Sequence, residues 1–86
     1  MKELERILKA LANRRRLAII KLLKNRKEAS VTEIAERIRL SFKATSKHLN
    51  ILSRVDLLDK EQRSLAVFYS LASDQKSFVS LLINHL

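Results

Sequence analysis

The sequence predicts a mainly α fold with one small β-hairpin, in the order helix, helix, helix, helix, strand, strand, helix. Three observations support this prediction. Apolar residues recur at helical spacing through most of residues 2–57, and two of the predicted helices there are separated by only about four residues. After residue 57 the pattern changes to short runs rich in β-forming side chains, before a last helical segment.

The first two predicted helices cover residues 2–11 and residue 14 to about residue 24. In the first, the apolar residues stand at i, i+3, i+4 and i+7; they are Leu4, Ile7, Leu8 and Leu11. Asn13 is the expected N-cap of the second helix, and Asn25 is expected to end it in a left-handed conformation. Three arginines, Arg14 to Arg16, occupy its first turn, where the helix dipole disfavours cations. We therefore expect Arg16 to contact phosphate. For Arg14 and Arg15, a role in solubility alone is an equal alternative to phosphate contact.

A capping box begins the third predicted helix, because Ser30 stands three residues before Glu33. This short helix extends to about residue 38. Ser41 then caps a longer helix over residues 41–55. Two helices joined by such a brief turn are typical of a helix-turn-helix, whose second helix enters the DNA major groove.

The helix over residues 41–55 has two unlike faces. The face expected to pack on the core carries Phe42, Thr45, His48, Leu49 and Leu52. The opposite face carries only hydrogen-bond donors and no carboxylate; its residues are Lys43, Lys47, Asn50 and Arg54, with Ser46 at the margin. Solvated helix faces usually interleave acids with bases, whereas base edges and phosphates of DNA favour donors. This face therefore indicates DNA binding, and a merely solvated cationic face is the alternative.

A β-hairpin is expected over residues 58–71, with strands at 58–61 and 65–71 and a tip at 62–64. Packed after a helix-turn-helix, such a hairpin is a wing. Lys60, Gln62 and Arg63 would then reach the DNA backbone or the minor groove.

The last predicted helix is capped by Ser73 or Asp74 and ends at Leu86. Apolar residues cover more than half of its circumference, so part of it should meet another chain, with deep insertion into the core as the alternative. The expected dimer contacts lie on the first and last helices; they are Leu4, Leu8, Leu11, Phe78, Leu81, Leu82 and His85.

Size and composition narrow the class of protein. The 86 residues, of which 47% are hydrophobic, fit one domain over residues 1–86 with a modest core that a partner chain often completes. A net charge of +9 favours a polyanionic partner, with nucleic acid ahead of a membrane surface. The chain has no cysteine, which excludes thiol-ligated metals and thiol redox sensing, and no glycine, which excludes phosphate-binding glycine loops. No apolar run is long enough to span a membrane, so we expect a cytoplasmic, nucleoid-associated protein without cofactor or metal.

Three segments resemble the ArsR/SmtB-type winged-helix transcriptional repressors. They are LKALANRRRLAIIKLL at 8–23, SVTEIAERIRLSFKATSKHLNILSRVDLL at 30–58 and AVFYSL at 66–71, and the resemblance extends from about residue 4 to residue 71. Its most specific part joins Ser46, His48, Leu49 and Leu52 on the recognition helix. The resemblance implies a homodimer built from the first and last helices that places two recognition helices on a near-palindromic operator in double-stranded DNA.

The chain also departs from this family. Ser30 and Thr32 stand where metal-sensing members carry a cysteine pair, and Asp74 and His85 are spaced too far apart to copy the family's zinc site. Metal sensing is therefore not expected. Arg39 and Asp56 replace two glycines that are common in the family, and a left-handed Arg39 would cost roughly 1 kcal/mol.

Three other functions compete with a sequence-specific regulator. An enzyme is the weakest, since no paired carboxylates or nucleophile–histidine set can be assembled and His48 is expected to pack rather than catalyse. A non-specific architectural DNA- or RNA-binding protein would use the same cations. A winged helix that binds other proteins through its last helix is the third. Asn50 best distinguishes sequence-specific from non-specific DNA binding, because asparagine can bond adenine bidentately.

Overall fold

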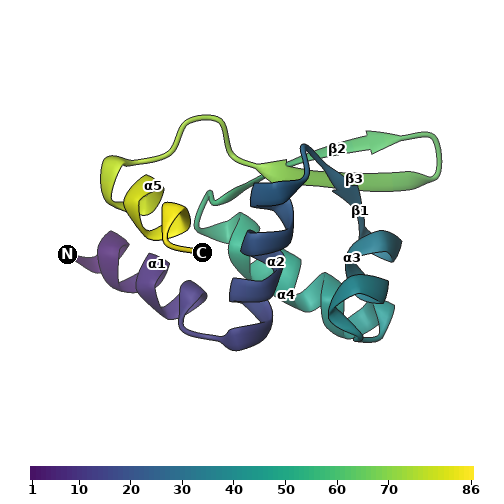
Figure 1. Ribbon diagram of the computed structural model, residues 1–86, viewed down its shortest axis with the longest axis horizontal. Helices are drawn as coiled ribbons and strands as arrows, with labels where there is room; N and C mark the ends of the chain where they lie inside the picture. The colour runs from purple at the N-terminus through teal and green to yellow at the C-terminus, as the bar shows by residue number, and fades with distance from the viewer.

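The computed structural model describes all residues 1–86 and contains five helices and three strands. In chain order they are α1 (Lys2–Leu11), α2 (Arg14–Asn25), β1 (Ala29–Ser30), α3 (Val31–Ile38), α4 (Phe42–Arg54), β2 (Leu58–Arg63), β3 (Ala66–Leu71) and α5 (Ser77–Asn84). The predicted fold class is confirmed: helices α2, α3 and α4 pack together, and the β2–β3 hairpin projects from them as a wing (Figure 1).

The strands form one antiparallel sheet in the order β1-β3-β2. Strand β1 was not predicted, because two residues are too short to show a period. The hairpin turn lies at residues 64–65 rather than 62–64, since Arg63 still pairs with Ala66. Ser64 takes the left-handed conformation that this tight turn needs, with φ of 57°.

Most of the predicted helix caps are confirmed. The Asn13 side chain accepts hydrogen bonds from the backbone of Arg15 and Arg16, and the Ser30–Glu33 capping box is complete. Asn25 is not left-handed: it is the last residue of α2, and Arg26 follows it in an extended conformation that leads toward β1.

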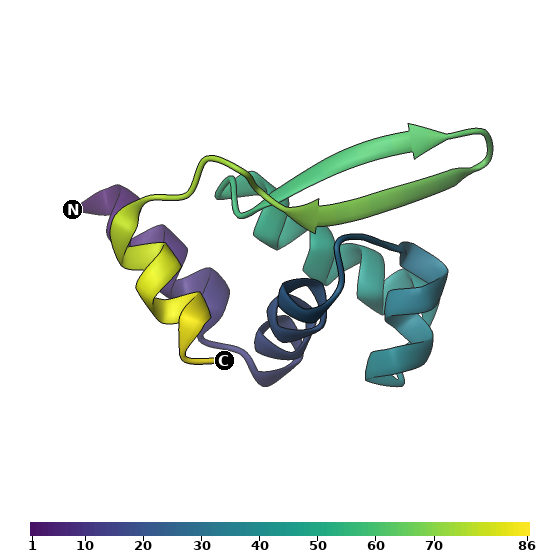
Figure 2. The ribbon, with the colours of Figure 1, turned by 45° about the horizontal axis from the view of Figure 1, so that its top comes forward.

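The start of α5 differs from the prediction. Lys76, not Ser73 or Asp74, is its N-cap, and no side chain caps the helix. The backbone N–H of Ser73 donates instead to Asp59 (3.3 Å), and the Gln75 side chain donates to the Leu57 carbonyl (3.1 Å). These bonds fix the segment 73–76, which bends at Ser73 and Asp74, between the sheet and the end of the molecule where α5 begins (Figure 2).

A single cluster of sixteen buried apolar residues forms the core, and every helix and all three strands contribute to it. Ile19, Ile20, Ile34, Leu49 and Leu52 are completely buried at its centre. Helices α1 and α5 lie at one end of the molecule and the wing at the other (Figures 1 and 2). No helix combines the length and the apolar character that a membrane crossing requires.

Candidate nucleic-acid interface

The turn between α3 and α4 sets the direction of α4. Arg39 is left-handed (φ 58°, ψ 48°), and the next amide, that of Leu40, donates to the Ala35 carbonyl at 3.0 Å. The chain then reverses into Ser41, whose hydroxyl accepts from the Ala44 amide at 3.1 Å and begins α4. An arginine at this left-handed position costs roughly 1 kcal/mol relative to glycine.

One face of α4 is fixed in the core. Thr45, Leu49 and Leu52 are fully buried there, and His48 is half-buried. Phe42 does not join them: its side chain is 60% exposed, so the prediction that it packs is wrong. It is the first residue of α4.

The opposite face of α4 is free. Lys43, Lys47, Asn50 and Arg54 are all exposed, and no hydrogen bond or ion pair within the protein engages their side chains. Ser46 is half-buried at the edge of this face, as its marginal position predicted. Four adjacent donors without acceptors are arranged to meet an acceptor-rich partner, and base edges and phosphates supply such acceptors.

Arg16 is half-buried, and its guanidinium is bonded within the protein. Its Nε donates to the Ala10 carbonyl at 2.6 Å, Nη2 donates to the Lys9 carbonyl at 3.4 Å, and Nη1 lies 3.2 Å from Nδ1 of His48. Burial lowers the pKa of His48, and the positive charges of Arg16 and Arg15 lower it further. A neutral His48 can therefore accept the Arg16 hydrogen bond. This geometry gives Arg16 the role of joining α1, α2 and α4, and it does not support the phosphate contact that the sequence predicted.

The wing presents its polar residues on two faces. Lys60 and Gln62 lie two positions apart on β2 and therefore share one face, where both are exposed and unpaired. Arg63 lies on the other face and donates to carboxylates of Glu28 and Glu61, each with one contact at 2.7 Å. It also stacks over the Phe68 ring, with 4.7 Å from the guanidinium carbon to the ring centroid. These bonds raise the pKa of Arg63 and lower that of Glu28, so the arginine charge is already partnered.

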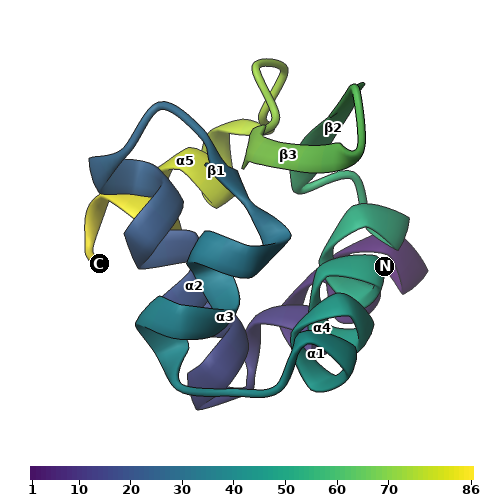
Figure 3. The same ribbon diagram turned by 90° about the vertical axis from the view of Figure 1, so that its right-hand side faces the viewer.

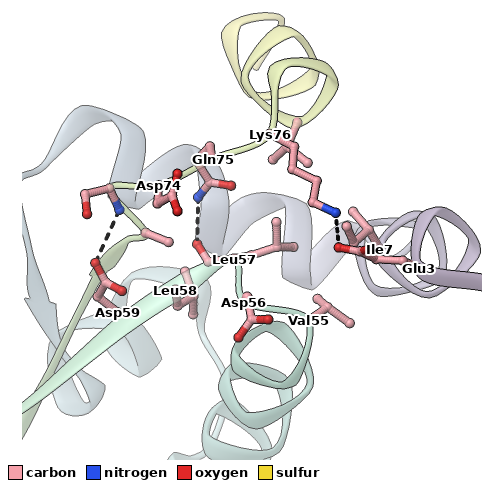
Figure 4. A pocket seen from close by; sticks show the side chains of 13 residues that line it. Glu3, Ile7, Val55, Asp56, Leu57, Leu58, Asp59, Asp74, Gln75 and Lys76 are labelled. Carbon is pink, nitrogen blue, oxygen red and sulfur yellow. Dashed lines mark hydrogen bonds and ion pairs between the residues drawn. The ribbon is translucent and has the colours of Figure 1, made fainter.

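Negative charge gathers around one cavity of the molecule. A cavity of about 340 Å³ opens between α1, the start of β2 and the segment before α5, and four carboxylates line it; they are Glu3, Asp56, Asp59 and Asp74 (Figure 4). Lys76 pairs with Glu3 at its rim. Such a surface repels phosphate, so we expect nucleic acid to avoid it. No group of three or more His, Asp or Glu side chains is placed to hold a metal ion.

The end of the molecule formed by α1 and α5 is apolar. Leu81, Leu8 and Leu82 are 63%, 46% and 40% exposed, and Leu8 and Leu82 line the same groove. Of the other predicted dimer contacts, Leu4 and Phe78 are half-buried and His85 is exposed, whereas Leu11 is buried in the core of its own chain.

Comparisons with known proteins agree with this architecture. A family model described as a helix-turn-helix domain matches residues 6–61. The transcriptional activator HlyU of Vibrio cholerae is 42% identical over 77 residues, which is 88% of this chain and 70% of that protein. A solved structure of Vibrio cholerae HlyU superposes with a TM-score of 0.84 at 36% identity, covering 98% of this chain and 87% of that one.

A second solved structure is the homodimeric winged helix-turn-helix DNA-binding domain of Mb0332 from Mycobacterium bovis, described as a possible ArsR-family transcriptional regulator. It has a TM-score of 0.83 at 28% identity and covers 98% of this chain and 74% of that one. The helix-turn-helix match spans well over half of the chain, and the wing and flanking helices agree with both structures. The chain therefore belongs to the ArsR-type family of winged helix-turn-helix transcriptional regulators.

Proposed function

We propose that this protein is a homodimeric transcriptional regulator that recognises a near-palindromic site in double-stranded DNA. The observation that carries the proposal is the free donor face of α4, where Lys43, Lys47, Asn50 and Arg54 project from a helix whose other side is locked in the core. Asn50 and Lys43 are the candidates for base contact, together with Ser46, while Lys47 and Arg54 would also neutralise phosphates. Binding to double-stranded DNA would support a location in the cytoplasm, at the nucleoid.

Dimer formation is proposed from the apolar end of the molecule. Exposed Leu8 and Leu81, with Leu82 and the half-buried Leu4 and Phe78, form an apolar surface that a second copy would cover. The homodimeric state of the similar Mycobacterium bovis domain supports this assignment. Two α4 helices in one dimer would contact half-sites about 34 Å apart, one turn of DNA.

Whether binding represses or activates transcription depends on where the operator lies. The family resemblance predicts a repressor, while the similar Vibrio cholerae protein carries the name of an activator. The same dimer can block a promoter or displace another protein from it, so we propose operator binding itself as the function of this chain.

Asn50 provides the test of sequence recognition. A cognate site is first selected from random duplex DNA by the wild-type protein, and binding to that site and to a scrambled duplex is then measured by fluorescence anisotropy at fixed salt. One bidentate base contact contributes about 1–3 kcal/mol, so Asn50→Ala should weaken cognate binding about 5- to 150-fold and leave scrambled-duplex binding nearly unchanged.

Asn25→Ala is the matched control, because Asn25 is an exposed asparagine at the end of α2. It should alter neither affinity. Equal losses on both duplexes for Asn50→Ala, or failure of the selection to enrich any sequence, would favour the architectural binding mode that a net charge of +9 also permits.

A further inference from the structure

A second cationic surface lies between α2 and α3. It is an open groove of about 560 Å³, and the half-buried apolar side chains of Leu22 and Ile38 form part of its lining, here called its apolar floor. Five basic residues line it and no acidic residue does; they are Arg14, Arg15, Lys21, Arg26 and Arg37. We call this surface the α2–α3 groove.

Two of these five cations are partnered inside the protein. Arg26 pairs with Glu33 at 3.0 Å, and Arg15 donates to the Ile38 carbonyl at 3.0 Å. The side chains of Arg14, Lys21 and Arg37 have no hydrogen bond or ion pair. Unbalanced cations around one groove repel each other and destabilise the folded chain, so an anionic ligand bound there would relieve that repulsion.

The α2–α3 groove does not face the same way as the donor face of α4. Helices α2, α3 and α4 form a three-helix cluster, in which the buried side of α4 contacts the other two. Figure 3 shows α2 and α3 on one side of this cluster and α4 on the other. The free donors of α4 lie opposite its buried contacts and point away from α2 and α3. We therefore expect a duplex held by α4 to leave the groove accessible.

The shape and chemistry of the groove favour a protein ligand over nucleic acid. Phosphate binding needs cations only, and the apolar floor would stay uncovered beneath a sugar–phosphate backbone. An acidic amphipathic segment satisfies both parts, with carboxylates on the free cations and apolar side chains on Leu22 and Ile38. Arg14 and Lys21 are seven residues apart on α2, a rise of about 10 Å, which matches two turns of a bound helix.

We propose that the α2–α3 groove is a docking surface for an acidic, amphipathic segment of a partner protein, open while α4 holds DNA. A regulator with this surface can contact a second protein at its operator without giving up its DNA contacts.

The test uses a synthetic peptide of about 14 residues with glutamate and leucine at helical spacing, labelled for fluorescence anisotropy at about 0.15 M salt. The groove variant is Arg14→Gln/Lys21→Gln/Arg37→Gln. The control variant Lys2→Gln/Arg6→Gln/Lys27→Gln removes equally many exposed cations outside the groove. The groove variant should bind the peptide at least tenfold more weakly than the control variant, and a peptide with its leucines replaced by serine should lose binding to the wild type.

Two further measurements exclude misfolding of the variant and non-specific charge attraction as explanations of a loss of peptide binding. The groove variant should melt at the same or a higher temperature than the wild type, because repulsion is removed. In the wild type, peptide should shift the amide NMR signals of residues 18–22 and 37–38, and saturation with a DNA duplex should leave peptide affinity unchanged. Equal weakening of peptide binding in both triple variants would overturn the proposal. So would displacement of the peptide by DNA together with a flatter salt dependence of DNA binding in the groove variant, because these two results would make the groove part of the DNA-binding surface.

Discussion

Replacing Arg16 with methionine tests the largest difference between the sequence-based prediction, a phosphate contact, and the structure, in which Arg16 is bonded within the protein. The guanidinium joins three helices: Nε donates to the Ala10 carbonyl at 2.6 Å, and Nη1 lies 3.2 Å from His48. A hydrogen bond from a charged group contributes about 1.5–3 kcal/mol, and the half-buried setting argues for the lower part of that range. Methionine retains the apolar stem, so Arg16→Met should lower the free energy of unfolding by about 2–4 kcal/mol, mainly through loss of the bonds to Ala10 and His48.

This loss is a large share of the roughly 5–15 kcal/mol that stabilises a typical domain. Urea unfolding, followed by circular dichroism at a fixed protein concentration, measures it directly, and the melting temperature should fall by about 10–20 °C. Arg14→Met is the control, because the exposed Arg14 has no bond to lose; we expect a change below about 0.5 kcal/mol.

The salt dependence of DNA binding supplies the result that would refute this reasoning. If Arg16 contacts phosphate, Arg16→Met will reduce the slope of log affinity against log salt by about 0.9 while stability stays near that of the wild type. If the structural role holds, the slope will stay unchanged at temperatures where the variant is folded.

Three further predictions concern single sites. Folding lowers the pKa of His48 below its ordinary value of 6.5, so the unfolded chain binds the proton more readily than the folded chain. The free energy of unfolding should therefore be highest above about pH 6.5 and should fall as the pH decreases below that value. His48→Gln should flatten this dependence in urea titrations between about pH 7.5 and 5.5. Arg39→Gly should raise the free energy of unfolding by up to about 1 kcal/mol, because relief of left-handed strain exceeds the added entropy of the unfolded chain, and a decrease would contradict it. Glu28→Gln/Glu61→Gln should release Arg63 from both of its carboxylate partners, tighten binding to cognate and scrambled duplexes alike and steepen the salt slope by up to about 0.9. An unchanged slope would show that Arg63 has no access to phosphate.

Local patterns were enough to predict the scaffold of the proposed DNA interface. The Ser30–Glu33 box and the Ser41 cap fix where α3 and α4 begin, and helical spacing separates Leu49 and Leu52 from the donor face of α4. These features depend on residues within one or two turns of each other, so they are visible in the sequence. The left-handed Arg39 was suggested differently, by the family resemblance, because a glycine is common at that position in the family.

Features that depend on distant residues could not be predicted in this way. Arg16 was predicted to contact phosphate because it lies in a run of three arginines, but its hydrogen-bond partners Ala10 and His48 are 6 and 32 residues away along the chain. Arg63 is held by Glu28, 35 residues away. Strand β1 exists only because β3 pairs with it, so its two residues carry no signal of their own.

The three left-handed residues show how a chain without glycine can still form precise joints. Arg39 stands before α4, Asp56 stands after it, and Ser64 stands in the turn of the wing, so these positions lie at both ends of α4 and at the tip of the wing. Each costs of order 1 kcal/mol relative to glycine. A side chain at the same position also restricts the conformations that the joint can reach, and a binding helix held within a fraction of an ångström retains its contacts better than one on a flexible hinge. We therefore expect Arg39→Gly to stabilise the fold and yet to reduce discrimination between cognate and scrambled DNA, and a variant that gains both stability and discrimination would disprove this account of the joints.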